Sequence, residues 1–248
     1  MEEKEFYNKV GKNIGWDFSK INSRTIVENK TWKITDIIKS YLNKDKIVLD
    51  LGIGGGEKTL LLSPLCKELI GIDNSEEMII KANDNLKKTD NNNCKFIVAY
   101  IKSLPFNDEY FDVITCRHAP INVTEIHRVL KKGGIFISQQ VGEEDKLNIK
   151  DIFGRGQNFS HKSGEQVKRV LEEFKKLDFE IIKFERYNAI EYYKDMQDII
   201  FLLENTPIIP NFNIKKDKEK LKELEVKYGT DKGIKTNSER YLIITKKR

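Results

Sequence analysis

The sequence predicts an α/β fold with a doubly wound, mainly parallel sheet. Three observations support this fold class. Short apolar runs, typical of buried parallel strands, alternate with helical periodicity along most of the 248 residues. One such run, 48–51, leads directly into four glycines within five positions, at 52 and 54–56. Two successive runs also contain or end in an acid, Asp50 and Asp73, and ligands of doubly wound sheets bind at the carboxyl ends of strands.

The first half of the chain predicts alternating helices and strands behind an aromatic N-terminal segment. Residues 3–19 place aromatic side chains among charges, as expected of an amphipathic segment that packs on a larger body. The expected helices are 31–42, 57–65 and 76–87, and the expected strands are 48–51, 68–73 and 95–99. A helix therefore lies between neighbouring strands, as parallel pairing requires.

The second half of the chain predicts four more strands and one insertion. The expected strands are one within 108–115 and three more at 135–141, 179–184 and 240–245, and the expected helices are 122–130 and 163–177. Lys131-Lys132-Gly133-Gly134 is expected to form the turn after the helix at 122–130. Residues 192–238 hold an apolar helix and a Lys/Glu-rich helix at 215–228. This insertion is either a lid over a ligand or a packing appendage, and the sequence leaves both open.

The composition excludes several classes of protein. A chain that is 39% hydrophobic and 33% charged is globular, and none of its apolar runs reaches membrane-spanning length. The three cysteines, Cys66, Cys94 and Cys116, are unevenly spaced and favour neither disulfides nor a zinc site. We therefore expect no metal and a reducing, cytoplasmic location. The net charge of +5 arises from 44 basic and 39 acidic residues that are interspersed, which permits nucleic-acid contact without favouring it.

The glycine-rich turn is the strongest local signal of a ligand site. Glycines at 52 and 54–56 remove every Cβ from the turn, so the backbone can approach a ligand closely. The following helix would point its free N–H groups at that ligand. A dinucleotide fingerprint starting at Gly52 would need glycine or alanine where Glu57 stands, so the NAD interpretation fails. A simple tight turn, with Asp73 as a helix cap, is the alternative.

The motifs along the chain resemble those of class I S-adenosylmethionine-dependent methyltransferases. The matching segments are D-x-G-x-G-x-G at 50–56, L-P-F at 104–106, F-D-V at 111–113 and V-L-K-K-G-G at 129–134. The Arg-His pair at 117–118 and the closing R-Y-L-I-I at 240–244 resemble a poorly characterised bacterial subgroup of the type 11 methyltransferases. The resemblance implies a seven-stranded Rossmann-like methyltransferase sheet with N-terminal helices and a helical insertion before the last strand.

The resemblance also implies how the chain is divided. We expect one methyltransferase domain over residues 1–248. Its parts are an N-terminal cap segment at 1–30, a cofactor-binding core at 31–191, an insertion or lid at 192–238 and the last strand at 239–248.

S-adenosylmethionine is the cofactor that this resemblance implies. Asp50 would help to hold its amino group, the Gly52–Gly56 loop would pack on its methionine part and sugar, and Asp73 would hold its ribose. The cofactor-binding residues expected by position are Asp50, Gly52, Ile53, Gly54, Gly56, Asp73, Asn74, Met78, Tyr100 and Ile101. Family members often have Gly-Asp where this chain has Ala99-Tyr100, so Tyr100 would replace the usual acid at the adenine.

The loop after the fourth predicted core strand supplies the candidate catalytic residues. His118 is the best candidate for a base because histidine titrates near neutral pH, and Arg117 could pair with an acidic substrate. The alternative is that His118 only bonds nearby backbone.

A small-molecule methyltransferase is the leading prediction for the function. Aromatic residues of the N-terminal segment, such as Tyr7 and Trp16, could close over a compact pocket. An RNA methyltransferase and a non-catalytic cofactor-binding module are the alternatives. We expect no membrane partner and a monomer or homodimer.

Overall fold

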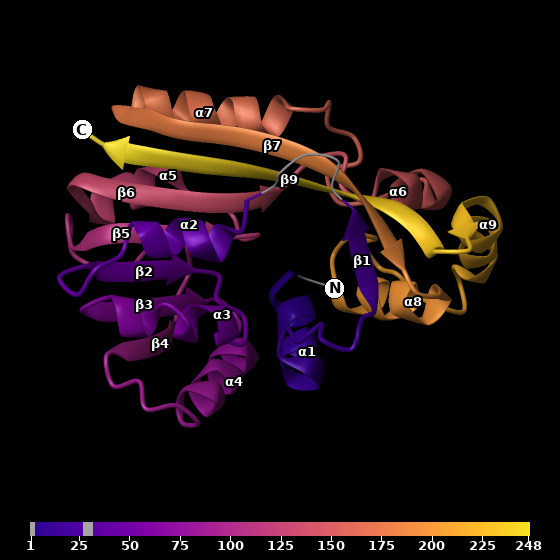
Figure 1. Cartoon of the computed structure of the whole chain (residues 1–248), viewed down its shortest axis with the longest axis horizontal. Coiled ribbons are helices and arrows are strands. Elements are labelled where there is room, and N and C mark those ends of the chain that lie inside the picture. Colours follow the sequence, from indigo (N-terminus) through magenta and orange to yellow (C-terminus); the bar gives the residue numbers. More distant parts are fainter. Residues whose placement is uncertain (1–2, 27–31) are drawn as a thin grey trace.

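A nine-stranded sheet organises the residues that the computed structural model describes, which are 3–26 and 32–248 (Figure 1). The strands are β1 (Ser23–Ile26), β2 (Ile47–Leu51), β3 (Glu68–Asp73), β4 (Cys94–Val98), β5 (Phe111–Arg117), β6 (Leu130–Val141), β7 (Phe179–Tyr193), β8 (Gly229–Thr230) and β9 (Gly233–Lys247). Their order across the sheet is β1-β7-β9-β6-β5-β2-β3-β4, and β8 pairs with β9 outside this path.

The predicted doubly wound, mainly parallel architecture is confirmed. The pairs β2–β3, β2–β5, β3–β4 and β5–β6 are parallel. β9 is antiparallel to both of its long neighbours, β6 and β7, so β7 runs in the same direction as β6. The seven predicted strands are all present. Two further short strands were not predicted: β1 pairs antiparallel with β7, and β8 pairs antiparallel with β9.

Helices connect the parallel strands and cover the sheet. They are α1 (Glu3–Ile14), α2 (Ile34–Ser40), α3 (Glu57–Leu60), α4 (Glu76–Leu86), α5 (Val123–Val129), α6 (Leu147–Phe153), α7 (Glu165–Lys176), α8 (Met196–Asn205) and α9 (Lys218–Tyr228). The helix predicted at 57–65 is broken into α3 and a 3-10 turn at Ser63–Leu65, and residue 31 of the helix predicted at 31–42 lies outside the described residues. Within the described chain, no helix is both long and apolar enough to cross a membrane.

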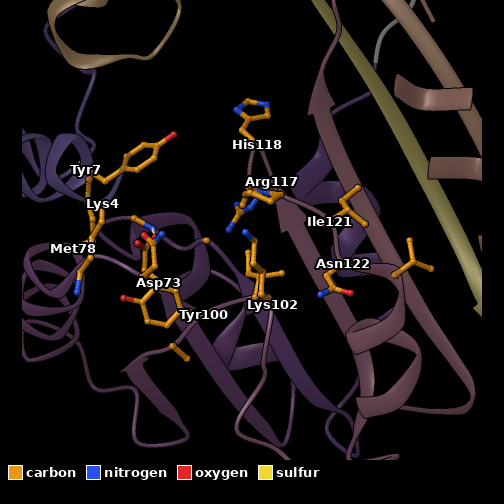
Figure 2. A pocket seen from close by; sticks show the side chains of 18 of the residues that line it. Lys4, Tyr7, Asp73, Met78, Tyr100, Lys102, Arg117, His118, Ile121 and Asn122 are labelled. Carbon is orange, nitrogen blue, oxygen red and sulfur yellow. Dashed lines mark hydrogen bonds between the residues drawn. The ribbon is translucent and has the colours of Figure 1, made fainter. Parts of the chain in front are cut away.

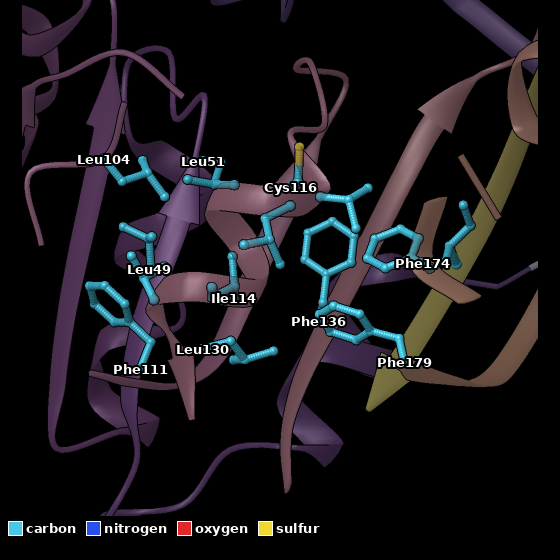
Figure 3. Close-up of a cluster of buried hydrophobic side chains, with 14 of the residues drawn as sticks. Leu49, Leu51, Leu104, Phe111, Ile114, Cys116, Leu130, Phe136, Phe174 and Phe179 are labelled. Carbon is cyan, nitrogen blue, oxygen red and sulfur yellow. The ribbon is translucent and has the colours of Figure 1, made fainter. Parts of the chain in front are cut away.

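Alternate residues of the core strands pack against opposite layers of helices. On one face, Leu49 and Ile114 join the side chains of α5 and α7 (Figure 3). On the other face, Val48 and Val113 join those of α2, α3 and α4. Because side chains alternate along a strand, strands covered on both faces must be apolar throughout, which explains the continuous runs in the sequence.

The long strands β7 and β9 extend beyond this core as a ribbon (Figure 1). Around their far ends, α6, α8 and α9 form a third apolar cluster with Tyr193 and Ile234. Phe18 and Ile21, from the segment after α1, pack against the same cluster. The insertion predicted at 192–238 therefore packs on the ribbon and on the N-terminal segment.

Buried ion pairs hold the ribbon where β6 ends. The Lys146 ammonium donates to the Glu191 carboxylate and to the carbonyl of Asn237. Asp145 accepts from the guanidinium of Arg240 and from a backbone N–H of β9. Such buried charges are tolerated because each has an opposite charge and further hydrogen bonds.

Phe174 gives a direct test of the layer between the sheet and α7. Its ring is fully buried, with its centroid 5.3 Å from that of Phe136 and 5.0 Å from that of Phe179. We expect Phe174→Ala to lower the free energy of unfolding by about 3–5 kcal/mol, because it leaves a cavity between these rings. Val226→Ala, at an 87% exposed position of a distant helix, should change it by less than about 0.5 kcal/mol. Urea unfolding measures both, and equal losses would contradict this packing.

Candidate functional site

A cavity of about 730 Å³ lies at the carboxyl ends of the parallel strands (Figure 2). Its volume is within the range of small-molecule and cofactor sites. The structure brings most of the predicted site residues together in its wall: Gly52, Gly54, Asp73, Asn74, Met78, Tyr100, Ile101, Arg117 and His118. Asp50, Ile53 and Gly56 lie behind this wall.

The glycine loop has a shape that other residues could not adopt without strain. Gly52 and Gly54 have φ of +70° and +55°, in the left-handed region. A Cβ on Gly52 would lie 2.4 Å from the Cβ of Ala119, and one on Gly54 would lie 3.1 Å from the Cβ of Trp16. The loop therefore needs glycine for its conformation and for its close approach to both neighbours.

Asp73 keeps half of its accepting capacity for a ligand. One carboxylate oxygen accepts from the backbone N–H of Gly54 and the other from that of Ser75, both at 3.0 Å. An ionised carboxylate has about four lone-pair sites, so two remain free of these bonds. Burial raises the pKa of Asp73, while the backbone N–H groups of Ser75, Gly54 and Asn74 act in the opposite direction. Ser75, not Asp73, caps α4, so the capping alternative does not explain this acid.

Asp50 is buried and bonds to three side chains of the protein. It is 1% exposed and accepts from the hydroxyls of Thr59 and Thr115, both at 2.6 Å, and from Nη2 of Arg117 at 2.7 Å. The carboxylate thus joins β2 to α3 and β5 beneath the cavity. Its predicted contact with a cofactor amino group would have to compete with these bonds.

One nitrogen of the Arg117 guanidinium makes no hydrogen bond to the residues that the structure describes. Its Nη1 is buried and has no hydrogen-bond partner among residues 3–26 and 32–248. A buried donor without a partner costs about 1–3 kcal/mol. Arg117 as a residue lines the cavity wall, below His118 in the view of Figure 2.

Met78, Tyr100 and Lys4 form another part of the cavity wall. Met78 is 1% exposed, and Tyr100 is half-exposed, with the Lys4 ammonium 5.9 Å from its ring centroid. Lys4 also pairs with Glu76 of α4 at 3.1 Å, which ties α1 to the core.

Residues of α1 and the turn after it form part of the wall that the sequence did not assign to the cofactor site. Tyr7 and Trp16 line the cavity, with ring centroids 5.7 Å apart. Lys4, Lys102 and Asn122 also line it, and no motif identified them. Their aromatic or charged character was visible in the sequence, but their position in the fold was not.

His118 has an unusual backbone and an environment that disfavours its charged form. Its φ is +57°, and its N–H donates to the carbonyl of Gln139 at 3.0 Å. The residue is exposed where it lines the cavity, and desolvation by the groups packed around it lowers the pKa of His118. The positive charges of Arg240 and Lys58 act in the same direction. His118 therefore bonds backbone and also presents its ring to the cavity.

The fold and the site together define a class I S-adenosylmethionine-dependent methyltransferase. The model of the family described as "Methyltransferase domain" matches residues 42–175. Because this match covers more than half of the chain, the protein belongs to that family, whose cofactor is S-adenosylmethionine.

Similar proteins include methyltransferases from several bacteria. "Uncharacterized methyltransferase YcgJ" of Bacillus subtilis is 39% identical over 97 residues, covering 36% of this chain and 38% of the relative. Demethylmenaquinone methyltransferase of Geobacillus stearothermophilus is 25% identical over 164 residues, covering 62% and 70%. The crystal structure of the YcgJ protein from Bacillus subtilis superposes with a TM-score of 0.65 at 23% identity, covering 87% of this chain and 98% of that one. The chain spans less than half of the length of the first two curated relatives it matches.

The environment of His118 leads to a test by titration. We expect its ring to stay neutral between about pH 5 and 8, where an unperturbed histidine with a pKa near 6.5 becomes charged. The pKa of His118 is lower in the folded chain than in the unfolded chain. The neutral ring therefore stabilises the fold fully above about pH 6.5, and this contribution is lost as the pH falls toward 3. Proton NMR of the imidazole C–H signals measures this. His118→Asn assigns the signal, since asparagine tolerates a positive φ, and an inflection near pH 6.5 in that signal would contradict the expectation.

Proposed function

We propose that this protein transfers the methyl group of S-adenosylmethionine to a small organic molecule. The main support is one continuous cavity that joins the glycine loop and Asp73 to the β5–α5 loop and is closed on one side by α1 (Figure 2). It offers space for two ligands side by side, as transfer between them requires.

The residues around the cavity fit the parts of this cofactor. The two free acceptor sites of Asp73 suit two ribose hydroxyls, and the half-exposed ring of Tyr100 and the side chain of Ile101 suit an adenine. The guanidinium of Arg117, a residue that lines the cavity, suits the carboxylate of the methionine part. Gly52 and Gly54 leave room for the chain between these ends.

Methyl transfer requires little from the protein beyond positioning of the two reactants. The cofactor supplies an electrophilic methyl group: the lone pair of the acceptor bonds to its carbon, and the electrons of the breaking carbon–sulfur bond return to sulfur. Alignment of the two reactants supplies much of the rate, so the walls of the cavity matter more than a reactive side chain. We assign His118, which lines the cavity on the β5–α5 loop, to the reacting end.

Two observations favour a small molecule over a nucleic acid as the acceptor. α1 and its turn contribute Lys4, Tyr7 and Trp16 to the cavity wall, so this segment encloses part of the site, as a compact ligand favours. The relatives named for demethylmenaquinone and for ubiquinone/menaquinone biosynthesis act on small quinones according to their names. We propose further that the insertion at 192–238 supports the N-terminal cap, because Phe201 contacts Phe18 and no residue of the insertion lines the cavity.

Calorimetric titration of S-adenosylmethionine into wild type and Asp73→Asn tests the cofactor site. An asparagine offers only one carbonyl oxygen, so it cannot accept from both N–H groups and from the ribose hydroxyls together. We expect affinity to fall by about 10- to 100-fold, which corresponds to roughly 1–3 kcal/mol. Asp84→Asn, an exposed change on α4, is the matched control and should bind as wild type does.

Methyl transfer from labelled cofactor to a panel of small aromatic molecules, quinols included, tests the second half of the proposal. Cofactor binding together with transfer to RNA alone would overturn the small-molecule assignment. Absence of binding by the wild type would overturn the methyltransferase function itself. Binding without transfer to any acceptor would instead indicate a cofactor-binding module.

A further inference from the structure

The ring of His118 is held by a short chain of hydrogen bonds that the methyl-transfer proposal does not use. Nε1 of Trp32 donates to Oε1 of Gln139 at 2.8 Å, and Nε2 of Gln139 lies 3.1 Å from Nε2 of His118. Gln139 lies on β6 directly opposite Arg117, and its backbone carbonyl also accepts the N–H of His118. Gln139 therefore holds both the backbone and the ring of His118.

Trp32 fixes which way the Gln139 amide points. An indole N–H only donates, so the atom of Gln139 that faces it must be the carbonyl oxygen. The amide nitrogen must then face His118, and an amide nitrogen only donates. Trp32 is itself held, since its ring packs against that of Tyr187 with centroids 4.7 Å apart.

The hydrogen bonds from Trp32 to Gln139 and from Gln139 to His118 allow only one protonation state of the His118 ring. Its Nε2 must accept, so Nε2 carries no proton, and the proton of the neutral ring sits on Nδ1. Within residues 3–26 and 32–248, no group bonds to Nδ1, and the ring is exposed where it lines the cavity. Nδ1–H is therefore a donor without a partner among these residues, on a ring of the cavity wall.

The surrounding charges favour the same state. Arg240, Lys58 and Arg117 disfavour a positively charged ring, and Asp145 opposes them, with a net lowering of the pKa of His118. A neutral ring could take up a proton only at Nε2, and that atom faces Gln139 rather than the cavity.

We propose that Trp32 and Gln139 are positioning residues that hold His118 as the Nδ1–H tautomer, so that it donates a hydrogen bond to the methyl-accepting substrate instead of acting as its base. The substrate atom that faces His118 is then an acceptor, such as a carbonyl or phenolate oxygen. This last step depends on the proposed function, whereas the tautomer itself does not.

Histidine-selective ¹⁵N labelling and long-range ¹⁵N–¹H correlation spectra of the full chain at neutral pH test the tautomer. Only three histidines contribute signals, and His118→Asn identifies those of His118 by their loss. We expect an unprotonated Nε2 and a protonated Nδ1. A protonated Nε2 in the wild type would overturn the proposal, whatever the cofactor titration shows.

Gln139→Glu separates positioning from a structural role. A carboxylate accepts from Trp32 and also from His118, so Nε2 should become protonated. Gln197→Glu, the same change at an exposed position of α8, should leave the wild-type tautomer. An unchanged His118 signal in folded Gln139→Glu would overturn the proposal.

Trp32→Phe gives a second, milder variant if the glutamate disturbs folding. Phenylalanine keeps a ring against Tyr187 but lacks the donor, so the Gln139 amide is free to turn. We expect signals of both His118 tautomers in this variant, and a single Nδ1–H form would show that Trp32 has no part in the positioning. A protein that binds no cofactor yet shows the expected tautomers would contradict the proposed function and leave this inference standing.

Discussion

The buried carboxylate of Asp50 is the interaction on which the site depends. It ends the central strand β2 and binds hydroxyls from α3 and β5 together with the guanidinium of Arg117. A buried charge is stable only when it is fully paired, so any partner lost would leave an unsatisfied acceptor in the core. The same bonds hold Asp50 two residues before the glycine loop and fix one nitrogen of the Arg117 guanidinium. One acid thus connects the glycine loop, α3 and the end of β5.

The glycine loop also determines how closely the N-terminal cap approaches. A Cβ on Gly55 would lie 2.4 Å from the carbonyl oxygen of Gly15, which ends the cap helix, and a Cβ on Gly54 would meet Trp16. Gly11 of the cap in turn packs against α4, where a Cβ would lie 3.0 Å from that of Glu77. The glycines of the loop therefore allow close approach on two sides, to the cavity and to the segment that ends α1. The cap is held to the cofactor loop by contact between backbones, which makes the cavity wall continuous.

The core of the fold was predictable from the sequence because its signals are local. Strands buried on both faces appear as apolar runs, and Gly52, Gly54 and Asp73 follow them at fixed spacing. The ribbon was underestimated, since β7 and β9 continue through charged residues such as Glu191 that find partners only in the folded chain. α6 was missed because it follows Lys146, which has a left-handed backbone and no capping side chain. Tyr7 and Trp16 line the cavity, as their aromatic character led us to expect, whereas the place of Lys4 beside them depends on tertiary packing.

The charged residues of the cavity wall influence the ionisation of a ligand bound there. Of the described lining residues, only Asp73 and Glu173 carry a carboxylate, and Asp73 is already bound to two backbone N–H groups. Lys102 and Arg117 add positive charge to the same wall, and Arg117 is paired with the buried Asp50. Such surroundings favour the ionised form of a bound acid, because a nearby positive charge lowers its pKa. If the proposed methyl transfer takes place here, an acceptor that ionises in this field would need no base from the protein.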